Sequence, residues 1–204
     1  FMQSGRLPLS LEKTDLADFL DELSQHAADL CQQAGRTLEA DLPQAPIFVW
    51  IDRRQVRRAL LALLSNAIKF TAPEGVLHLT LMRLGKRAVI RLSDNGEGMD
   101  AEILISAFRR YARPDVPEDP RFGAGFSLPV VQAIMQAHGG SILLQSQKSG
   151  GTDALLTLPV GEPADRTLLK SPRISVDRSG GFAPELVELS DVLPPEVFDV
   201  RNFL

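Results

Sequence analysis

Asn66 and Lys69 stand three residues apart near the end of an expected helix, so both side chains project from nearly the same side of it. The amide oxygen of asparagine is a ligand that Mg²⁺ accepts, and Mg²⁺ commonly reaches a protein through few ligands plus phosphate oxygens. The ammonium of Lys69 offers those phosphates a mobile positive charge. The pair fits either a metal–phosphate site or an ordinary helix surface.

Asp94 ends an expected strand and is followed by glycines at positions 96 and 98. A carboxylate there can accept a hydrogen bond from the exocyclic amine of a ligand, and the backbone of Gly96 and Gly98 can leave room for a flat ring. The same Asp-Asn-Gly sequence is also common in an Asx turn. Both interpretations stay open at this point.

Gly123-Ala124-Gly125 precedes an expected helix, where free backbone N–H groups favour phosphate. A hinge or a plain helix cap is the alternative. No Gly-Lys-Ser/Thr follows and no strand directly precedes, so neither the P-loop nor the Rossmann pattern applies. The loop over 112–122, which contains three prolines, is long for a compact domain, and such loops are usually functional. It is expected to be a lid over an anionic ligand.

Hydrophobic periodicity supplies the frame for these residues. Apolar residues recur at three- and four-residue spacing over 14–34 and 52–70, which predicts two amphipathic helices, and Asp52 and Asp100 are expected helix N-caps. The remaining expected elements are strands over 37–41, 47–51, 76–84, 88–93, 141–147 and 152–159 and helices over 100–111 and 129–138. This order predicts a two-layer α/β sandwich, with helices on one face of a mixed sheet.

Composition excludes several classes of protein. With 44% hydrophobic and 24% charged residues the chain is typical of a soluble globular protein, and a net charge of −4 leaves no reason to expect a nucleic-acid partner. Cys31 lies on an apolar helical stripe, which favours a buried small hydrophobe in the cytoplasm over a disulfide or a reactive thiol. No apolar run approaches the ~18 residues of a membrane span, although a longer parent could carry a membrane anchor.

The chain divides by composition into three parts. Residues 1–13 are polar and are interpreted as a lead-in, 14–160 as the folded domain, and 161–204 as an acidic, proline-containing tail. The first two turns of the helix over 52–70 carry a cluster of four arginines, namely Arg53, Arg54, Arg57 and Arg58. This cluster is either a solvated face or a docking surface for an acidic partner element.

Taken together, the motifs resemble the catalytic, ATP-binding domain of the sensor histidine kinases, within the GHKL ATPase superfamily. Residues 63–71 look like the N box of that family, 94–99 like its first glycine box and 108–111 like its F box. Residues 123–128 resemble the second glycine box, and 150–152 resemble the closing glycine–threonine element. The resemblance covers about residues 10–160, and it implies the Bergerat-type α/β sandwich with mostly antiparallel strands and an ATP lid.

The resemblance also implies roles for individual residues, with ATP and Mg²⁺ as the cofactors. Asp94 would bind the adenine amino group, Phe70 would pack against the ring, and Asn66 would hold Mg²⁺ beside phosphate-binding Lys69. Asn66 and Lys69 are therefore the expected catalytic residues. The other expected nucleotide contacts are Gly96, Gly98, Met99, Arg109, Arg110, Tyr111, Gly123, Gly125, Phe126, Leu128 and Thr152.

The reaction implied is transfer of the γ-phosphoryl group of ATP to a histidine, and then to an aspartate on the receiver domain of a response regulator. Such a reaction depends mostly on positioning and charge stabilisation. The acceptor histidine would lie on a dimerisation domain outside this chain, and residues 1–13 would be the end of its helices. The full-length parent would be a homodimer and this fragment a monomer.

None of the three histidines resembles a phosphoacceptor. His26 is followed by Ala-Ala-Asp, which is not the H box of the family, and is expected on a helix surface. His78 is expected to be structural on a strand. His138 stands at a helix C-terminus, where a positive charge or a hydrogen bond to a carbonyl is favourable.

The chain departs from the family pattern at Ala62, where a further asparagine is common, at Ala124, which replaces a hydroxyl residue, and at Ser127, which replaces a glycine. Ser127 is expected to need a less permissive backbone. These departures motivate an alternative function, a degenerate nucleotide-sensing or non-catalytic interaction module. A GHKL ATPase of the gyrase, chaperone or mismatch-repair kind is the third possibility.

Overall fold

The computed structural model describes residues 9–108 and 127–162. Its elements, in chain order, are β1 (Glu12–Asp15), α1 (Leu16–Gln33), β2 (Thr37–Asp41), β3 (Phe48–Ile51), α2 (Arg53–Phe70), β4 (Val76–Leu84), β5 (Arg87–Asp94), α3 (Ala101–Ser106), α4 (Ser127–Ala137), β6 (Ser141–Ser146) and β7 (Thr152–Pro159). The helices and strands predicted from periodicity are therefore confirmed, with the differences described below.

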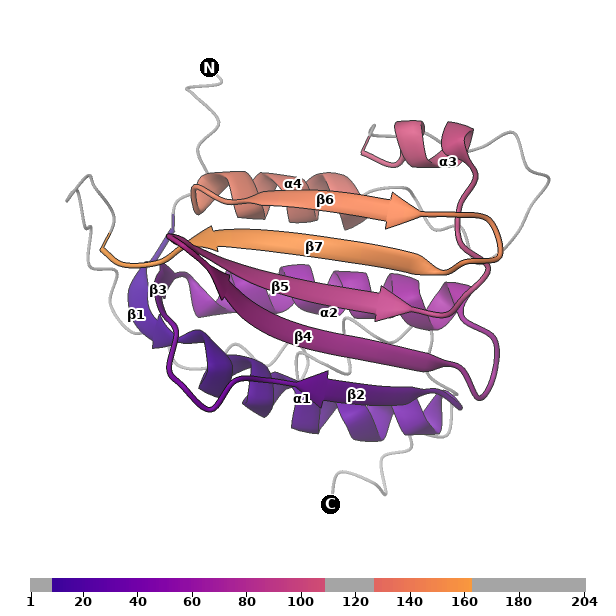
Figure 1. Ribbon diagram of the computed structural model, residues 1–204, viewed down its shortest axis with the longest axis horizontal. Helices are drawn as coiled ribbons and strands as arrows, with labels where there is room; N and C mark the ends of the chain where they lie inside the picture. The colour runs from indigo at the N-terminus through magenta and orange to yellow at the C-terminus, as the bar shows by residue number, and fades with distance from the viewer. Residues whose placement is uncertain (1–8, 109–126, 163–204) are drawn as a thin grey trace, which may run out of the picture.

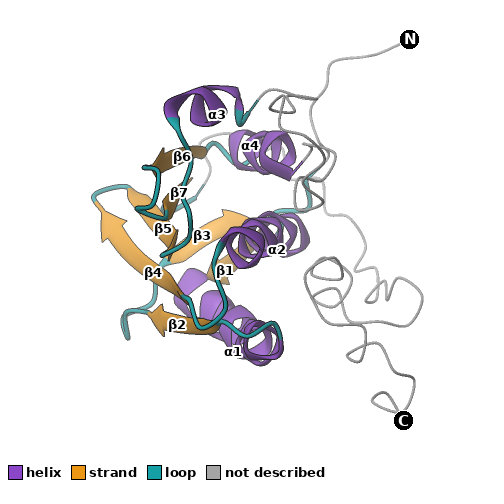
Figure 2. Cartoon of the chain, turned by 90° about the vertical axis from the view of Figure 1, so that its right-hand side faces the viewer, coloured by secondary structure: helices purple, strands orange, loops and turns teal. Residues whose placement is uncertain are grey.

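Five strands form one sheet in the order β2-β4-β5-β7-β6, with β2 parallel to β4 and the other neighbours antiparallel. Figure 1 views the molecule from the strand side, and Figure 2, turned by 90°, shows α1, α2 and α4 together on one side of the sheet. The predicted fold class, a two-layer α/β sandwich with a mixed, mostly antiparallel sheet, is confirmed.

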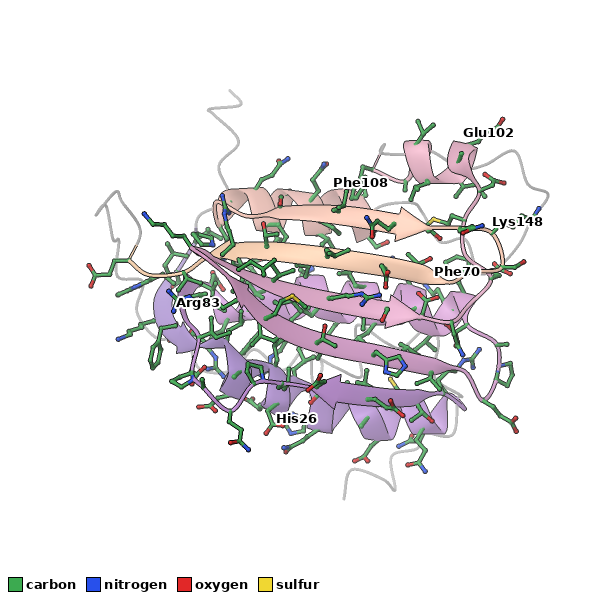
Figure 3. The ribbon with its side chains drawn as sticks, viewed as in Figure 1. His26, Phe70, Arg83, Glu102, Phe108 and Lys148 are labelled. Atoms are coloured by element: carbon green, nitrogen blue, oxygen red, sulfur yellow. The ribbon has the colours of Figure 1, made fainter. Side chains whose placement is uncertain are left out.

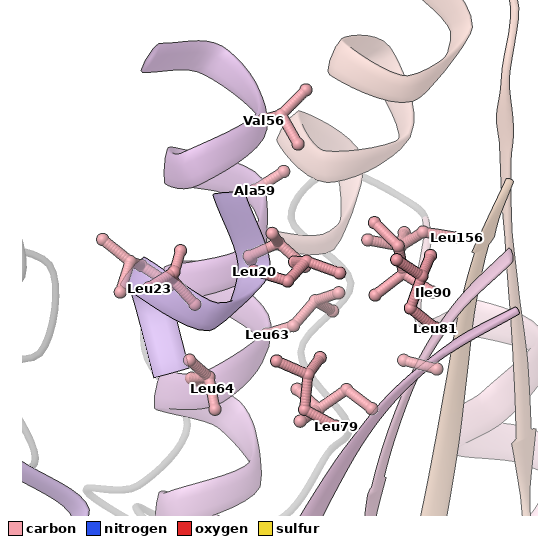
Figure 4. Packing of buried hydrophobic residues seen from close by; sticks show 14 of the residues in the cluster. Leu20, Leu23, Val56, Ala59, Leu63, Leu64, Leu79, Leu81, Ile90 and Leu156 are labelled. Atoms are coloured by element: carbon pink, nitrogen blue, oxygen red, sulfur yellow. The ribbon is translucent and has the colours of Figure 1, made fainter. Parts of the chain in front are cut away.

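The core lies between the helices and the sheet. Leu20 and Leu23 of α1 and Leu63 and Leu64 of α2 are buried. Figure 4 shows Leu20 and Leu63 between the helices and strand residues such as Leu79. Burial of a leucine side chain contributes about 1.5–3 kcal/mol of transfer free energy. The apolar face of each helix therefore fixes its position on the sheet and, with it, the position of the polar residues at its end.

The short strand β1 was not predicted, because its sequence Glu-Lys-Thr-Asp has no apolar alternation. It pairs with β3 in a separate two-stranded sheet, with Glu12 opposite Ile51. Asp15 then caps α1, and its Oδ1 accepts hydrogen bonds from the amides of Ala17 and Ile47, both at 3.1 Å. Glu12 and Lys13, at the end of the expected lead-in, thus pair with β3, and α1 begins shortly after them.

The helix predicted over 100–111 ends earlier than expected. Asp100 is its N-cap, as predicted, but α3 ends at Ser106. The amide of Ala107 bonds the carbonyl of Leu104, three residues back, and this tighter bond is typical of a final helical turn. The prediction of a helix reaching residue 111 was therefore wrong.

Part of the arginine cluster is used within the domain. Arg53 and Arg57 each donate to Glu22 of α1 at 2.8 Å, and both guanidinium groups lie over the ring of Phe19. The hydrogen bond from Arg57 lowers the pKa of Glu22. These two arginines therefore join α1 to α2.

Cys31 and His26, both on α1, take the environments predicted for them. Cys31 is fully buried, and burial raises the pKa of its thiol to about 11, so the side chain acts as a small hydrophobe. His26 is exposed on the surface of α1 (Figure 3). Within residues 9–108 and 127–162, no helix combines the length and the apolar character that crossing a bilayer requires.

Candidate functional site

Several of the predicted site residues that the structure describes meet at one end of the sheet. Asp94, the last residue of β5, lies opposite Thr152, the first residue of β7, and Ser146 at the end of β6 lies opposite the same threonine. Helix α2 ends at Phe70 beside them, and Figure 3 shows Phe70 and Lys148 at this end of the molecule. Segments from distant parts of the sequence thus converge here (Figure 1).

The carboxylate of Asp94 is held through one of its two oxygens. Its Oδ1 accepts hydrogen bonds from the amide of Gly96 at 2.9 Å and from the amide of Thr152 at 3.2 Å. The first bond is an Asx turn, so that interpretation of Asp-Asn-Gly is confirmed. Both of these amides bond Oδ1, so neither occupies Oδ2. The Asx turn and a ligand-binding role are therefore compatible.

Burial raises the pKa of Asp94, while the two hydrogen bonds from the amides of Gly96 and Thr152 act in the opposite direction. The nearby charge of Asp153 raises the pKa further. A half-buried carboxylate in its ionised form is a strong hydrogen-bond acceptor, because little water competes for it.

The glycines at this end let backbone segments approach one another closely. A Cβ on Gly96 would lie 2.3 Å from the carbonyl oxygen of Phe70, and one on Gly98 would lie 2.0 Å from that of Gln147. A Cβ on Gly151 would lie 2.0 Å from the carbonyl oxygen of Asp94. Gly98 and Gly151 also have positive φ angles, of 65° and 75°. The glycines therefore allow contact between the loop after β5, the end of α2 and the β6–β7 turn.

Ser146 joins the loop after β5, which contains Met99, to the glycine–threonine element over 150–152. The sequence did not reveal this role. The Oγ of Ser146 accepts a hydrogen bond from the amide of Met99 at 2.8 Å and donates one to the carbonyl of Gly151 at 2.8 Å. The hydroxyl of Thr152 lies 2.9 Å from the same oxygen. A serine hydroxyl has one donor and two acceptor positions, so these three contacts satisfy it completely.

The end of α2 carries Asn66 and Lys69, both half-buried. The Nδ2 of Asn66 donates a hydrogen bond to the Oγ of Ser127, the first residue of α4, at 3.3 Å. The guanidinium of Arg36 donates to the carbonyl of Thr71 from Nε at 3.1 Å and from Nη2 at 2.6 Å. A positive charge at the C-terminal end of a helix is favourable, so Arg36 stabilises this terminus.

Ser127 has the ordinary, restricted backbone that was expected of a serine in place of glycine. Among the described residues, the non-glycine positions with positive φ are Glu74 and Ser149, and Ser127 has helical geometry. Replacement of the family's glycine by serine is therefore compatible with the backbone at this position. Ala62, one turn before Asn66, packs against the hydrophobic core.

Several predicted residues lie outside the part of the chain that the structure describes. These are Arg109, Arg110, Tyr111, Gly123, Gly125 and Phe126, together with Ala124 and the expected lid over 112–122. Leu128, on α4, packs against the core, and Phe108 does the same. The structure thus brings together Asp94, the glycines, Met99 and Thr152 at the end of α2, and it places Asn66 beside α4.

Comparison with known proteins gives one matching family. The sequence model of the family described as histidine kinase-, DNA gyrase B- and HSP90-like ATPase matches residues 51–162. That range runs from the end of β3 to beyond β7, so it contains the site residues described above.

Two bacterial relatives illustrate the extent of the similarity. The alginate biosynthesis sensor protein KinB of Pseudomonas aeruginosa is 33% identical over 159 residues, which are 78% of this chain and 26% of KinB. The histidine protein kinase DivJ of Caulobacter vibrioides is 34% identical over 127 residues, which are 62% of this chain and 21% of DivJ. The chain therefore spans about a quarter or less of either relative.

Solved structures agree on the fold. The histidine kinase AdeS of Acinetobacter baumannii has a TM-score of 0.60 at 25% identity, with 76% of this chain and 70% of that chain covered. Full-length ShkA, solved in complex with AMPPNP, has a TM-score of 0.65 at 23% identity, with 79% of this chain and 34% of that chain covered. The architecture described above is thus shared with histidine kinases.

Proposed function

Because the chain belongs to the family of histidine kinase-, DNA gyrase B- and HSP90-like ATPases, we propose that it is the ATP-binding catalytic domain of a sensor histidine kinase. The two full-length relatives are described as a sensor protein and a histidine protein kinase. In this proposal the domain binds ATP and presents its γ-phosphoryl group to a histidine on a dimerisation domain of the same parent. The phosphoryl group then passes to the receiver domain of a response regulator.

The observation that carries the proposal is the way Asp94 is held. One carboxylate oxygen is fixed by the amides of Gly96 and Thr152, so the other can accept a hydrogen bond from the adenine amino group. A hydrogen bond from a neutral donor to a charged acceptor contributes about 1.5–3 kcal/mol. Phe70, which ends α2 beside this carboxylate, would pack against the adenine ring.

The residues present fit a magnesium ion that is bound mostly by phosphate. Within the described residues no group of three or more His, Cys, Asp or Glu side chains could hold a metal ion. Mg²⁺ beside a nucleotide needs one or two oxygen ligands from the protein, and Asn66 can supply an amide oxygen. When bound, the ion would neutralise charge that develops on the phosphates. Lys69, three residues further along α2, would contribute a positive charge on the same side.

The domain's own residues would then bind and orient the nucleotide. Positioning of this kind, with stabilisation of charge, is the main source of catalysis in phosphoryl transfer. Two of the described histidines have roles within the fold. His78 pairs with Glu39 at 3.1 Å on the sheet, and His138 is buried. An acceptor on a separate domain is consistent with both observations.

A thermal-shift titration with Mg·ATP tests the proposal. At one hundred times its dissociation constant, a ligand stabilises the folded state by about 2.7 kcal/mol. For a domain of this size that energy raises Tm by roughly 5–10 °C. An unchanged Tm at millimolar Mg·ATP would contradict the proposal and favour the non-catalytic interaction module.

A second measurement separates the kinase from other members of the family. Repeated ATP hydrolysis by this chain alone, measured as phosphate release without any histidine-containing partner, would favour an ATPase of the gyrase or chaperone kind. The kinase proposal expects nucleotide binding without sustained phosphate release.

A further inference from the structure

The contact between Asn66 and Ser127 links two helices across 61 residues of sequence, and it lies at the residue that would hold the metal ion. The Oγ of Ser127 accepts a hydrogen bond from the Nδ2 of Asn66 at 3.3 Å, and both side chains are half-buried. An asparagine amide carries its oxygen and its nitrogen on one planar carbon, so the two atoms point in different, fixed directions. A partner on the nitrogen therefore determines where the oxygen points.

We propose that Ser127 is a positioning residue that orients the Asn66 amide, so that the Oδ1 of Asn66 faces the phosphate-bound magnesium ion. This inference rests on the proposed function. A ligand residue commonly needs a second hydrogen bond that fixes its orientation, and loss of such a bond typically costs ten- to hundredfold in metal affinity. The hydrogen bond to Ser127 also leaves the amide nitrogen unable to turn toward the cation.

The two helices form a rigid frame for this contact. At their opposite ends, the amide of Asp52 donates to Nε2 of His138 at 3.0 Å, so α2 and α4 are joined near both termini. Sliding of one helix along the other would break both bonds. Ser127 therefore holds a fixed position relative to Asn66.

The neighbours of Asn66 on α2 explain why the partner has to come from another helix. Ala62 lies one turn earlier on nearly the same side, and a methyl group cannot hydrogen bond. A glycine at position 127, which the family resemblance predicts, would also lack the hydroxyl. The departure at Ser127 thus supplies a partner for Asn66 that the family pattern at that position does not.

The test compares Ser127→Ala, Ser127→Gly and Ser127→Thr with the parent chain. The dissociation constant of ATP is measured by calorimetry in excess Mg²⁺ and again in EDTA. Mg²⁺ tightens ATP binding by some factor in the parent chain, and this factor should be about tenfold smaller in the alanine and glycine variants. The dissociation constant measured in EDTA should be unchanged. Ser127→Thr, which keeps the hydroxyl, should restore the gain. Ser141→Ala is the matched control, because it removes a hydroxyl from an exposed serine on β6.

A ligand-free readout separates this inference from the proposed function. In the NMR spectrum of the ligand-free chain, the side-chain amide protons of Asn66 should shift on Ser127→Ala and stay unchanged on Ser141→Ala. An unchanged Asn66 signal, or an unchanged gain from Mg²⁺ in Ser127→Ala, would overturn the positioning role. If Mg²⁺ does not tighten ATP binding by the parent chain, the positioning role is also overturned. If the parent chain binds ATP neither in Mg²⁺ nor in EDTA, the proposed function itself fails.

Discussion

At the scale of single residues, Asp94 has a structural role through one carboxylate oxygen and a proposed ligand-binding role through the other. Oδ1 holds the turn to Gly96 and the start of β7, and Oδ2 is the proposed acceptor for adenine. Burial raises the pKa of Asp94, so the folded state binds this proton more tightly than the unfolded state. The contribution of Asp94 to the free energy of unfolding therefore falls as the pH rises through its folded pKa.

Gly98 gives a prediction at the same scale. Gly98→Ala should destabilise the domain by more than the roughly 1–2 kcal/mol that positive φ alone costs a non-glycine residue, because the added Cβ would meet the carbonyl oxygen of Gln147. Gly85→Ala is the matched control, since Gly85 also has positive φ but no heavy atom within 4 Å of the added Cβ. Urea unfolding gives both values. Equal losses in the two variants would show that close approach at Gly98 is unimportant.

At the scale of elements, helix α2 presents the site, and its two ends are held by different parts of the chain. Asp52 caps its start by accepting from the amide of Gln55 at 3.1 Å, and Arg36 bonds the carbonyl of Thr71 just beyond its end. His138, directly after α4, accepts a hydrogen bond from the amide of Asp52 through Nε2 and donates one from Nδ1 to the carbonyl of Ile134 at 2.7 Å. This arrangement requires the neutral imidazole.

The neutral state of His138 predicts a pH dependence of stability. Burial lowers the pKa of His138 from its ordinary value of 6.5, although the hydrogen bond to Ile134 and the charge of Asp52 oppose the shift. The unfolded chain therefore takes up this proton first as the pH falls below about 6.5, and the free energy of unfolding decreases. Urea unfolding at a series of pH values gives this dependence for the parent chain and for two variants. The free energy of unfolding of His138→Gln should no longer decrease in this way, whereas that of His26→Gln, changed on the exposed surface of α1, should decrease as in the parent. The same slope in the parent and in His138→Gln would contradict this assignment.

Sequence patterns located most of these elements but not the contacts between them. Helices α1 and α2 were predictable because their apolar residues repeat with the helical period. Strand β1 was not, because its four polar residues form a strand only through backbone pairing with β3. The contacts of Ser127 and Ser146 were also hidden, since they depend on segments that meet only after folding and leave no local signal in the sequence.

At the scale of the whole molecule, the fold gathers the ends of α2, β5 and β6 and the starts of β4 and β7 at one end of the sheet (Figure 1). The Asp94 loop, the β6–β7 turn and the end of α2 are therefore formed by residues distant in sequence, and the sheet register fixes their spacing. The chain spans about a quarter of the length of KinB, so the proposed transfer to histidine depends on further domains of the parent.

The measurement that tests this account most directly is the affinity of Asp94→Asn for Mg·ATP, determined by calorimetry beside the parent chain. The asparagine keeps an oxygen for the amides of Gly96 and Thr152, but it replaces the second acceptor by an NH₂ donor. Loss of about 1.5–3 kcal/mol of binding free energy should weaken Mg·ATP binding roughly ten- to hundredfold. The free energy of unfolding of the ligand-free variant should be maintained.

Asp41→Asn, at an exposed position on β2, is the matched control and should bind as the parent does. The account predicts weak binding by Asp94→Asn alone. Binding of Mg·ATP by Asp94→Asn with the affinity of the parent chain would contradict the assignment of Asp94 as the adenine acceptor, and with it the central claim.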